Sequence, residues 1–420
     1  MNILLTSVRI IDPGSKHHQT EKDIFIENGF ITRITEPNSI ASNDNYTILT
    51  IPNLHVSRGW FDSGVSFGEP GYESRENIAN GLRTAAASGF TNVAVNPNTL
   101  PVIDTKADVL FIKTRSLQNA VTVHPIGALT QGGKGTHLAE LYDMYNAGAV
   151  AFYDYQKPVK NPNLLKIAFQ YARGFDGLVY SFPQDHNIAG KGLVNEEVAA
   201  TSLGLKGIPS IAEELQIVRD LFILEYTHGK LHIPTISTAR SVDLIRNAKK
   251  KGLNVSCSVS VHHLCFTDEV LASFDTHFKV LPPLRTQNDI EALKKGIKDG
   301  TIDMVTTDHN PLDVEHKKVE FDYALYGTIG LESAFGMLNK VLGTETAIRL
   351  LTSGKKRFNI PSPPIAINTE ACLTLFDPNP EYTFSESMIQ SSSHNSAFLG
   401  QLCKGKALGI IAGKELVLNS

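Results

Sequence analysis

The sequence predicts an α/β fold in which a (β/α)8 TIM barrel carries a small β-sandwich built from both ends of the chain. Between residues 56 and 360, short β-branched segments alternate with helix-forming stretches. The strand-like segments lie at 91–95, 121–126, 150–153, 177–182, 231–236, 254–261 and 302–306. This alternation is typical of parallel βα units, and roughly eight of them complete a barrel. A doubly wound sheet is the alternative, but no Gly-x-Gly-x-x-Gly motif follows the first strand.

The two ends of the chain show a different pattern, with short strand-like segments and no alternating helices. Residues 1–55 contain short strand-like runs, and Asn28-Gly29 between two of them is a hairpin signal because both residues tolerate positive φ. A proline-rich break at 361–364 precedes further short strands. The sequence therefore predicts that residues 1–55 and 361–420 form the two parts of one β-sandwich, with the barrel at 56–360.

Composition excludes several classes of partner. The chain has 420 residues, 42% hydrophobic and 20% charged, with a formal net charge of −4. That balance gives no electrostatic reason to bind nucleic acid or an anionic membrane. The apolar runs are strand-sized, and the first residues lack the features of a signal peptide. Four scattered cysteines are typical of reduced thiols, so a cytoplasmic protein is expected.

The most informative segment is residues 60–71, which read Trp-Phe-Asp-Ser-Gly-Val-Ser-Phe-Gly-Glu-Pro-Gly. This segment resembles the first-strand signature of dihydroorotases, the cyclic amidohydrolases of pyrimidine synthesis, which runs Asp-x-His-x-His-x-Arg-Glu-Pro-Gly. Asp62 and residues 69–71 fit the pattern. In a strand, residues two apart point to one face, so the two histidines would share a metal ion. Gly64 and Ser66 stand at those histidine positions, and Gly68 stands at the arginine position.

The resemblance continues along the chain. Further matching segments lie at 96–101, 151–154, 203–213, 281–286, 300–309 and 395–400. It implies an amidohydrolase-type barrel, and it identifies two more metal-histidine positions, which are Ser181 and Thr235 here. A substrate asparagine and a further histidine of the family correspond to Leu281 and Leu312.

What remains of the family's site is a small polar set. By resemblance, Asp308 corresponds to the general base, and Asn98 and His309 to substrate-binding positions. If any metal were held, Asp62, Asp154 and Asp308 would be its ligands. Catalytic zinc prefers imidazole and carboxylate, with three protein ligands. Because the imidazoles are missing, no cofactor is expected, and zinc would be expected only if the protein is an enzyme.

Two interpretations follow. The first is a non-catalytic protein of de novo pyrimidine biosynthesis that acts as a structural partner of aspartate transcarbamoylase, as some metal-free relatives do. The alternative is an active dihydroorotase, or another cyclic-amide hydrolase, with rearranged metal ligands. His232, His262 and His263 are the other candidate ligands, but packed structural histidines are expected there, with His232 on the strand face opposite Thr235. A homodimer is expected by analogy with the family.

Overall fold

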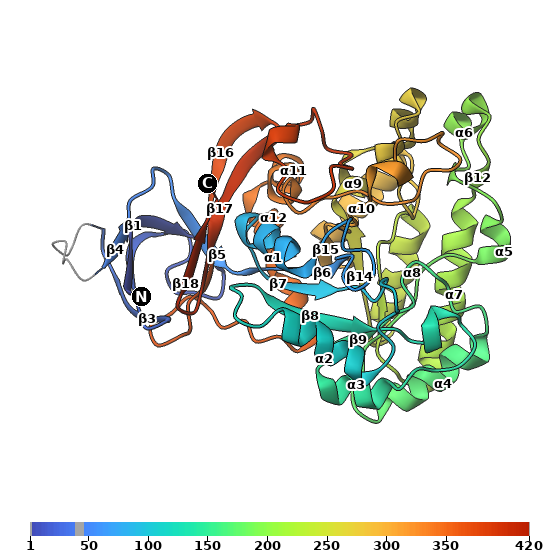
Figure 1. Ribbon diagram of the computed structural model, residues 1–420, viewed down its shortest axis with the longest axis horizontal. Coiled ribbons are helices and arrows are strands. Elements are labelled where there is room, and N and C mark those ends of the chain that lie inside the picture. The colour runs from blue at the N-terminus through green and yellow to red at the C-terminus, as the bar shows by residue number, and fades with distance from the viewer. Residues whose placement is uncertain (1, 38–45, 420) are drawn as a thin grey trace.

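A computed structural model describes residues 2–37 and 46–419 and contains a barrel flanked by a second, terminal sheet (Figure 1). The barrel strands follow one another in sequence order around a parallel sheet. They are β6 (Trp60–Val65), β7 (Phe90–Val95), β8 (Thr122–Gly127), β9 (Ala151–Phe152), β10 (Val179–Tyr180), β13 (Leu231–Ile233), β14 (Val255–Ser260) and β15 (Met304–Thr306). The Thr306 hydroxyl donates to the Gly64 carbonyl at 3.2 Å, which brings the last strand against the first. The predicted barrel is confirmed.

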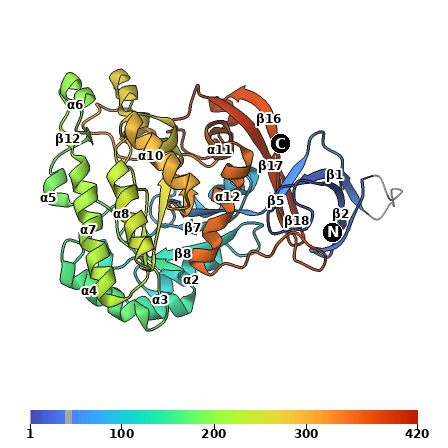
Figure 2. The same ribbon diagram turned by 180° about the vertical axis from the view of Figure 1, so that it is seen from behind.

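Helices follow the strands and cover the outside of the barrel (Figure 2). The main ones are α1 (Ile78–Ala87), α2 (Lys106–Arg115), α3 (Leu141–Ala147), α4 (Pro162–Arg173), α7 (Ser210–Thr227), α8 (Ala239–Lys250), α10 (Gln287–Lys298), α11 (Ala334–Leu342) and α12 (Thr344–Ser353). Shorter ones are α5 (His186–Ala189), α6 (Val198–Leu203) and α9 (Val261–Cys265). Local sequence fixes several ends: Thr286 and Asp289 cap α10 reciprocally in a capping box.

The terminal sheet joins both ends of the chain. Its strands are β1 (Asn2–Ile10), β2 (Glu21–Glu27), β3 (Phe30–Thr35), β4 (Thr47–Leu49), β5 (His55–Arg58), β16 (Cys372–Thr383), β17 (Leu402–Ala412) and β18 (Glu415–Leu418). The antiparallel pairing of β5 with β16 links the N-terminal strands to the C-terminal ones. Asn28 and Gly29 turn between β2 and β3 with φ of 53° and 87°, as the hairpin signal predicts. Outside both sheets, β11 (Val194–Asn195) pairs with β12 (Gly207–Ile208).

Aromatic packing fixes the barrel and its attachment. Phe61 points into the barrel, where its ring lies 4.9 Å from that of Phe358. Its neighbour Trp60 points outward, because successive strand residues face opposite sides, and packs on Phe335 and Phe376 at 4.9 and 5.9 Å. The first barrel strand is thereby held from both faces. No helix within the described residues has the length and apolarity needed to cross a membrane.

Candidate functional site

The candidate site lies at the carboxyl ends of the barrel strands, where barrel enzymes place their chemistry. The cavity there has a volume of only about 20 Å³. It is lined by Ser63, Gly64, Asn96, Tyr153, Tyr155, Gln156, Tyr180, Pro234, Thr235, Ser258, Thr306 and Asp308. A cavity of roughly this size holds about one water molecule. The barrel mouth is therefore closed to an organic substrate in this conformation.

Three tyrosines contribute most of the bulk around the cavity. The ring of Tyr153 lies 5.7 Å from that of Tyr155 and 5.3 Å from that of Tyr180. The Tyr180 hydroxyl donates to the Ser63 carbonyl at 3.2 Å, which ties β10 across to β6. All three side chains are buried or nearly so. None of the three was predicted from the sequence, although Tyr153 and Tyr180 directly precede Asp154 and Ser181.

Asp62 is buried on β6 and is surrounded by neighbouring hydrogen-bond donors. Its carboxylate accepts the backbone N–H groups of Gly64 and Thr307 at 3.0 and 2.9 Å. It also accepts the hydroxyls of Thr306, at 2.6 Å, and of Thr307. Such bonds satisfy a buried carboxylate without a cation. Asp62 therefore joins the first and last barrel strands.

Asp154 is satisfied in a similar way. Its carboxylate accepts the backbone N–H of Thr130 at 2.9 Å and also the Thr130 hydroxyl. Burial raises the pKa of Asp154, while the hydrogen bonds from Thr130 oppose that rise. Ser181, at a metal-histidine position, donates to Asp220 at 2.5 Å. Its hydroxyl therefore points to a buried carboxylate on α7.

Asp308 lines the cavity, whereas His309 does not. Burial, and then the charge of Asp62, raises the pKa of Asp308 well above the usual range of a carboxyl group. The backbone of Asp308 has φ of 49°. The next side chain, His309, is fully buried, and its Nδ1 accepts the backbone N–H of Gly330 at 3.2 Å. Burial lowers the pKa of His309 to about 4, so this imidazole is neutral at pH 7.

The two glycines of the first-strand segment differ in the space around them. A Cβ added to Gly64 would have its nearest neighbour, Thr306 Oγ1, at 3.6 Å, an ordinary contact. A Cβ added to Gly68 would lie 2.0 Å from the carbonyl oxygen of Tyr72. The chain itself fills the space of a side chain at position 68. Between the two, Ser66 accepts an amide hydrogen bond from Asn96 at 3.3 Å.

The placement of His232 corrects one prediction. Both His232 Nε2 and the Thr235 backbone N–H hydrogen bond to the Ser258 hydroxyl, at 3.1 and 3.3 Å. Thr235 also lines the cavity together with Tyr180 and Ser258, and the His232 ring contacts both of those side chains, so the expectation of opposite faces is wrong. Strand alternation does not reach Thr235, because β13 ends at Ile233 and Thr235 has φ of 48°. His232 is a buried, hydrogen-bonded histidine that packs 4.5 Å from Tyr180.

The remaining predicted positions lie beside the cavity or away from it. Asn98 does not line it; its neighbour Asn96 does. Leu281 is buried, and its carbonyl accepts the Gln156 amide at 3.1 Å. Leu312 lies in the wall of a different hollow of about 740 Å³. The structure thus gathers Gly64, Thr235 and Asp308 at the mouth and leaves these three outside it.

The residues at the mouth do not fit a zinc ion. In the parts of the chain that the structure describes, no three His, Cys, Asp or Glu side chains lie close enough together to hold a metal. Glycine has no donor, and serine and threonine hydroxyls are not among the ligands that zinc takes in proteins. The carboxylates of Asp62 and Asp154 are bound to N–H and O–H groups. No metal-dependent step can be built from this donor set.

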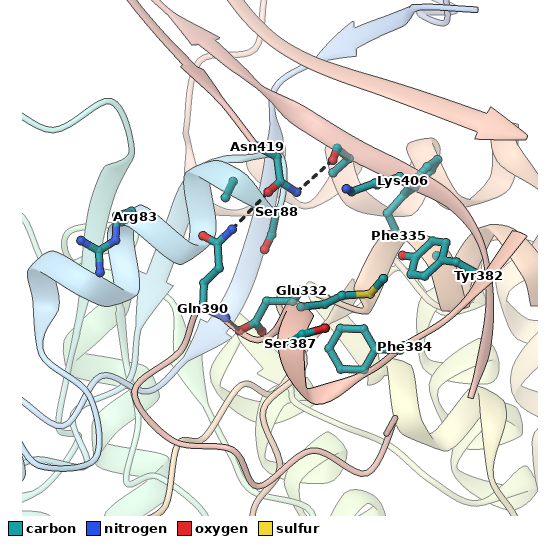
Figure 3. A pocket seen from close by; sticks show the side chains of 14 residues that line it. Arg83, Ser88, Glu332, Phe335, Tyr382, Phe384, Ser387, Gln390, Lys406 and Asn419 are labelled. Carbon is teal, nitrogen blue, oxygen red and sulfur yellow. Dashed lines mark hydrogen bonds between the residues drawn. The ribbon is translucent and has the colours of Figure 1, made fainter. Parts of the chain in front are cut away.

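A larger cavity, of about 510 Å³, lies outside the barrel mouth beside α1, α11 and the terminal sheet (Figure 3). Its walls include Arg83, Glu332, Phe335, Tyr382 and Lys406. The Gln390 amide donates to Asn419 at 3.1 Å, and the Asn419 amide donates to the Ala407 carbonyl at 3.3 Å. None of the family positions described above lines this cavity, so the barrel mouth remains the candidate site.

Solved structures share this fold at low sequence identity. An L-hydantoinase from Arthrobacter aurescens aligns with a TM-score of 0.85 and 21% identity, covering 99% of this chain and 96% of the other. A D-hydantoinase from Thermus sp. aligns with a TM-score of 0.81 and 18% identity, covering 99% and 95%. At these identities the likeness establishes the fold alone.

Sequence relatives are closer. A family model described as Dihydro-orotase-like matches residues 56–241. A dihydroorotase of Pelotomaculum thermopropionicum is 39% identical over 426 residues, covering 100% of this chain and 99% of the relative. A dihydroorotase of Citrifermentans bemidjiense is 37% identical over 427 residues, covering 100% of both. Identity of this extent, over the whole length, shows that the chain belongs to the dihydroorotase family.

Proposed function

We propose that this protein is a non-catalytic member of the dihydroorotase family that serves de novo pyrimidine biosynthesis as a structural partner of aspartate transcarbamoylase. One observation carries the proposal. The four positions that hold metal histidines in the family pattern are Gly64, Ser66, Ser181 and Thr235. A catalytic zinc site needs about three protein ligands of the imidazole, thiolate or carboxylate type. These four side chains supply none.

The environment of the replacements supports the same conclusion. Ser181 is bound to Asp220, and Ser66 to Asn96, so both hydroxyls have protein partners. The cavity of about 20 Å³ is far smaller than the roughly 300 Å³ at which small-molecule pockets begin. Opening it would require Tyr153 and Tyr155, which follow β9, and Tyr180 of β10 to leave a packed arrangement. A family member that keeps the fold but has no open zinc and substrate site at the barrel mouth is suited to act through its surface.

The alternative is an active enzyme that interconverts carbamoyl aspartate and dihydroorotate, or opens another cyclic amide. The names of the relatives favour it, since proteins 37–39% identical are called dihydroorotase. It requires a second conformation in which Asp308 and other residues gather around a metal. We favour the non-catalytic function because that conformation would still lack the imidazoles of the family pattern.

Metal stoichiometry separates the two functions. The protein is loaded with zinc, desalted, and assayed for bound metal and for dihydroorotate turnover, with a relative that retains all four histidines as the positive control. We expect far less than one zinc ion per chain and no turnover above the metal-free background. One or two tightly held ions together with turnover would establish the enzyme and overturn the proposal.

A binding experiment tests the partner. The protein is mixed with purified aspartate transcarbamoylase from the same organism and analysed by size-exclusion chromatography with light scattering. We expect a complex of defined stoichiometry that persists when chelator is added, because no metal is needed to maintain the fold. Separate elution at micromolar concentrations would contradict the partnership, whatever the zinc measurement shows.

A further inference from the structure

The cavity of about 510 Å³ lies where the barrel and the terminal sheet meet. The barrel contributes Arg83 from α1 and Phe335 from α11, and the terminal sheet contributes Tyr382 from β16 and Lys406 from β17. Pockets for small molecules have volumes of roughly 300–1,000 Å³ and often lie between domains. The size and the position of this cavity are therefore those of a binding site for a small organic molecule.

Glu332 distinguishes this cavity from an ordinary surface hollow. It lies just before α11 and forms part of the cavity wall (Figure 3). Its Oε1 accepts the backbone N–H groups of Gln390 at 3.3 Å and Ser391 at 3.0 Å, and the Ser391 hydroxyl at 2.6 Å. Its Oε2 is buried and has no hydrogen-bond donor among the residues that the structure describes. The protein thus holds one carboxylate oxygen and leaves the other without a donor.

The buried carboxylates at the barrel mouth show what is missing at Glu332. Asp62 accepts a backbone N–H on each of its two oxygens. Asp154 accepts the backbone N–H of Thr130 on one oxygen and the Thr130 hydroxyl on the other. Within residues 2–37 and 46–419, Glu332 Oε2 is the only carboxylate oxygen that is buried without a partner. Because a buried acceptor without a donor is destabilising, this oxygen requires a donor supplied from the cavity.

Two cations lie at the edge of the same cavity. They are Arg83 on α1 and Lys406 on β17, and both residues are exposed. The Arg83 guanidinium donates to Asn80, and neither cation forms an ion pair with the part of the chain that the structure describes. Figure 3 shows Arg83 and Lys406 on opposite sides of Glu332. An acidic group on a bound molecule can therefore bind either cation without displacing a carboxylate of this chain.

The charges of the wall define the class of molecule that fits. One carboxylate and two cations give the wall a net charge of +1. A complementary molecule has one ammonium group for Glu332 and two acidic groups for the cations, which gives it a net charge of −1. Charge-assisted hydrogen bonds of this kind are stronger than neutral ones. Met388 is 38% exposed beside the cavity, and Phe335 and Phe384 belong to its wall, so a short carbon chain has apolar neighbours.

We propose that this cavity binds a small anionic zwitterion of the acidic amino acid class. Its ammonium group donates to Glu332 Oε2, and its two carboxylates bind Arg83 and Lys406. Such a molecule contacts the barrel through α1 and the terminal sheet through β17, so its binding holds these two parts of the fold together. The site lies outside the barrel mouth and does not depend on whether the mouth binds a metal.

Isothermal titration calorimetry with the full-length chain tests the proposal. The probes are L-glutamate, L-aspartate and glutarate, which has the two carboxylates of glutamate but no ammonium group. We expect one molecule of L-glutamate or L-aspartate to bind per chain with a Kd below about 1 mM. Glutarate should bind at least about tenfold more weakly than L-glutamate, because it leaves Glu332 without a cation.

Two variants locate the bound molecule. Glu332→Gln removes the negative charge and keeps an acceptor for Ser391, whereas Lys406→Met removes one cation from an exposed position. We expect each substitution to raise the Kd of the amino acid by about tenfold or more, with an unchanged circular dichroism spectrum. Lys404→Met is the matched control, because Lys404 is also exposed on β17 but does not line the cavity, and the Kd should stay at the wild-type value.

Three results would overturn the proposal. They are the absence of binding of both amino acids at millimolar concentrations, glutarate binding as tight as that of L-glutamate, and a wild-type Kd in folded Glu332→Gln. If Glu332→Gln does not fold, Lys406→Met decides the question, because a wild-type Kd in that variant equally contradicts the site. The zinc, turnover and transcarbamoylase measurements concern other parts of the protein, so their outcomes and this one can be told apart.

Discussion

Two buried polar regions of this molecule stabilise a buried carboxylate in different ways. Behind α7 and β13, Arg285 donates to Asn195 at 2.7 Å, to the Ile208 carbonyl at 2.9 Å and to Ser237 at 3.1 Å, and its guanidinium lies 3.9 Å from Glu213. At the barrel mouth, the carboxylate of Asp62 is surrounded by hydroxyl and backbone N–H donors. One region keeps a buried cation, while the other satisfies its acid without one.

This difference explains which family segments the chain retains. The matching segments at 203–213 and 281–286 contain Glu213 and Arg285. Glu213 accepts the backbone N–H of Ser237, and Arg285 donates to the Ser237 hydroxyl, so both charged groups bind the same buried serine. A buried charge that loses its partner costs several kcal/mol, so such residues persist for structural reasons. At the mouth, hydroxyl and backbone N–H groups satisfy Asp62 and Asp154, so these carboxylates need no cation.

The largest effect is expected in the network that keeps its cation. Arg285→Met removes the guanidinium from Asn195, Ser237 and Ile208, and we expect the free energy of unfolding to fall by about 3–5 kcal/mol in urea denaturation. Arg246→Met is the matched control, since Arg246 bonds Asp243 and Asp299 near the surface and its loss should cost about 1 kcal/mol or less. Equal losses in the two variants would remove the distinction between the network and surface pairs.

An intermediate effect distinguishes the two glycines of the first-strand segment, Gly64 and Gly68. Gly68→Ala drives a methyl group into the Tyr72 carbonyl oxygen, and we expect a loss of about 2–3 kcal/mol. Gly64→Ala adds a methyl group in ordinary contact with Thr306, and a change within about 0.5 kcal/mol is expected. Chemical denaturation of both variants measures the difference. If Gly68→Ala is as stable as Gly64→Ala, the loop does not occupy the side-chain space at position 68.

The smallest effect tests the role of the surviving acid. Asp62→Asn turns one acceptor oxygen into an N–H donor that faces the backbone N–H of either Gly64 or Thr307, both of which already donate, and we expect a loss of about 1–2 kcal/mol. Asp176→Asn is the control, because Asp176 has an exposed side chain that forms a surface salt bridge with Lys230, and little change is expected.

Metal content of the same variant sharpens the comparison. If Asp62 is a structural acceptor, zinc content should be equally low before and after Asp62→Asn. A wild-type protein that binds zinc and loses it in this variant would show instead that Asp62 still serves as a ligand.

Much of the barrel could be predicted because each strand and helix is determined by residues close together in the sequence. Alternating strand and helix segments recur in order, and the parallel sheet follows that order strand by strand. The turn at Asn28-Gly29 follows from the backbone freedom of two adjacent residues. That Gly64, Ser66, Ser181 and Thr235 carry no imidazole, thiolate or carboxylate is likewise a property of residue identity, because zinc takes those groups as its ligands in any fold.

The contents of the barrel mouth were decided by the tertiary structure. The tyrosines that close it come from the segment after β9 and from β10, and farther along the first-strand segment the space at Gly68 is taken by the backbone of Tyr72. The positive φ of Thr235 carries it to the same serine as His232, against the alternation of an ideal strand. Sequence by itself determined which donors this protein has, but only packing between distant segments decided what those donors meet.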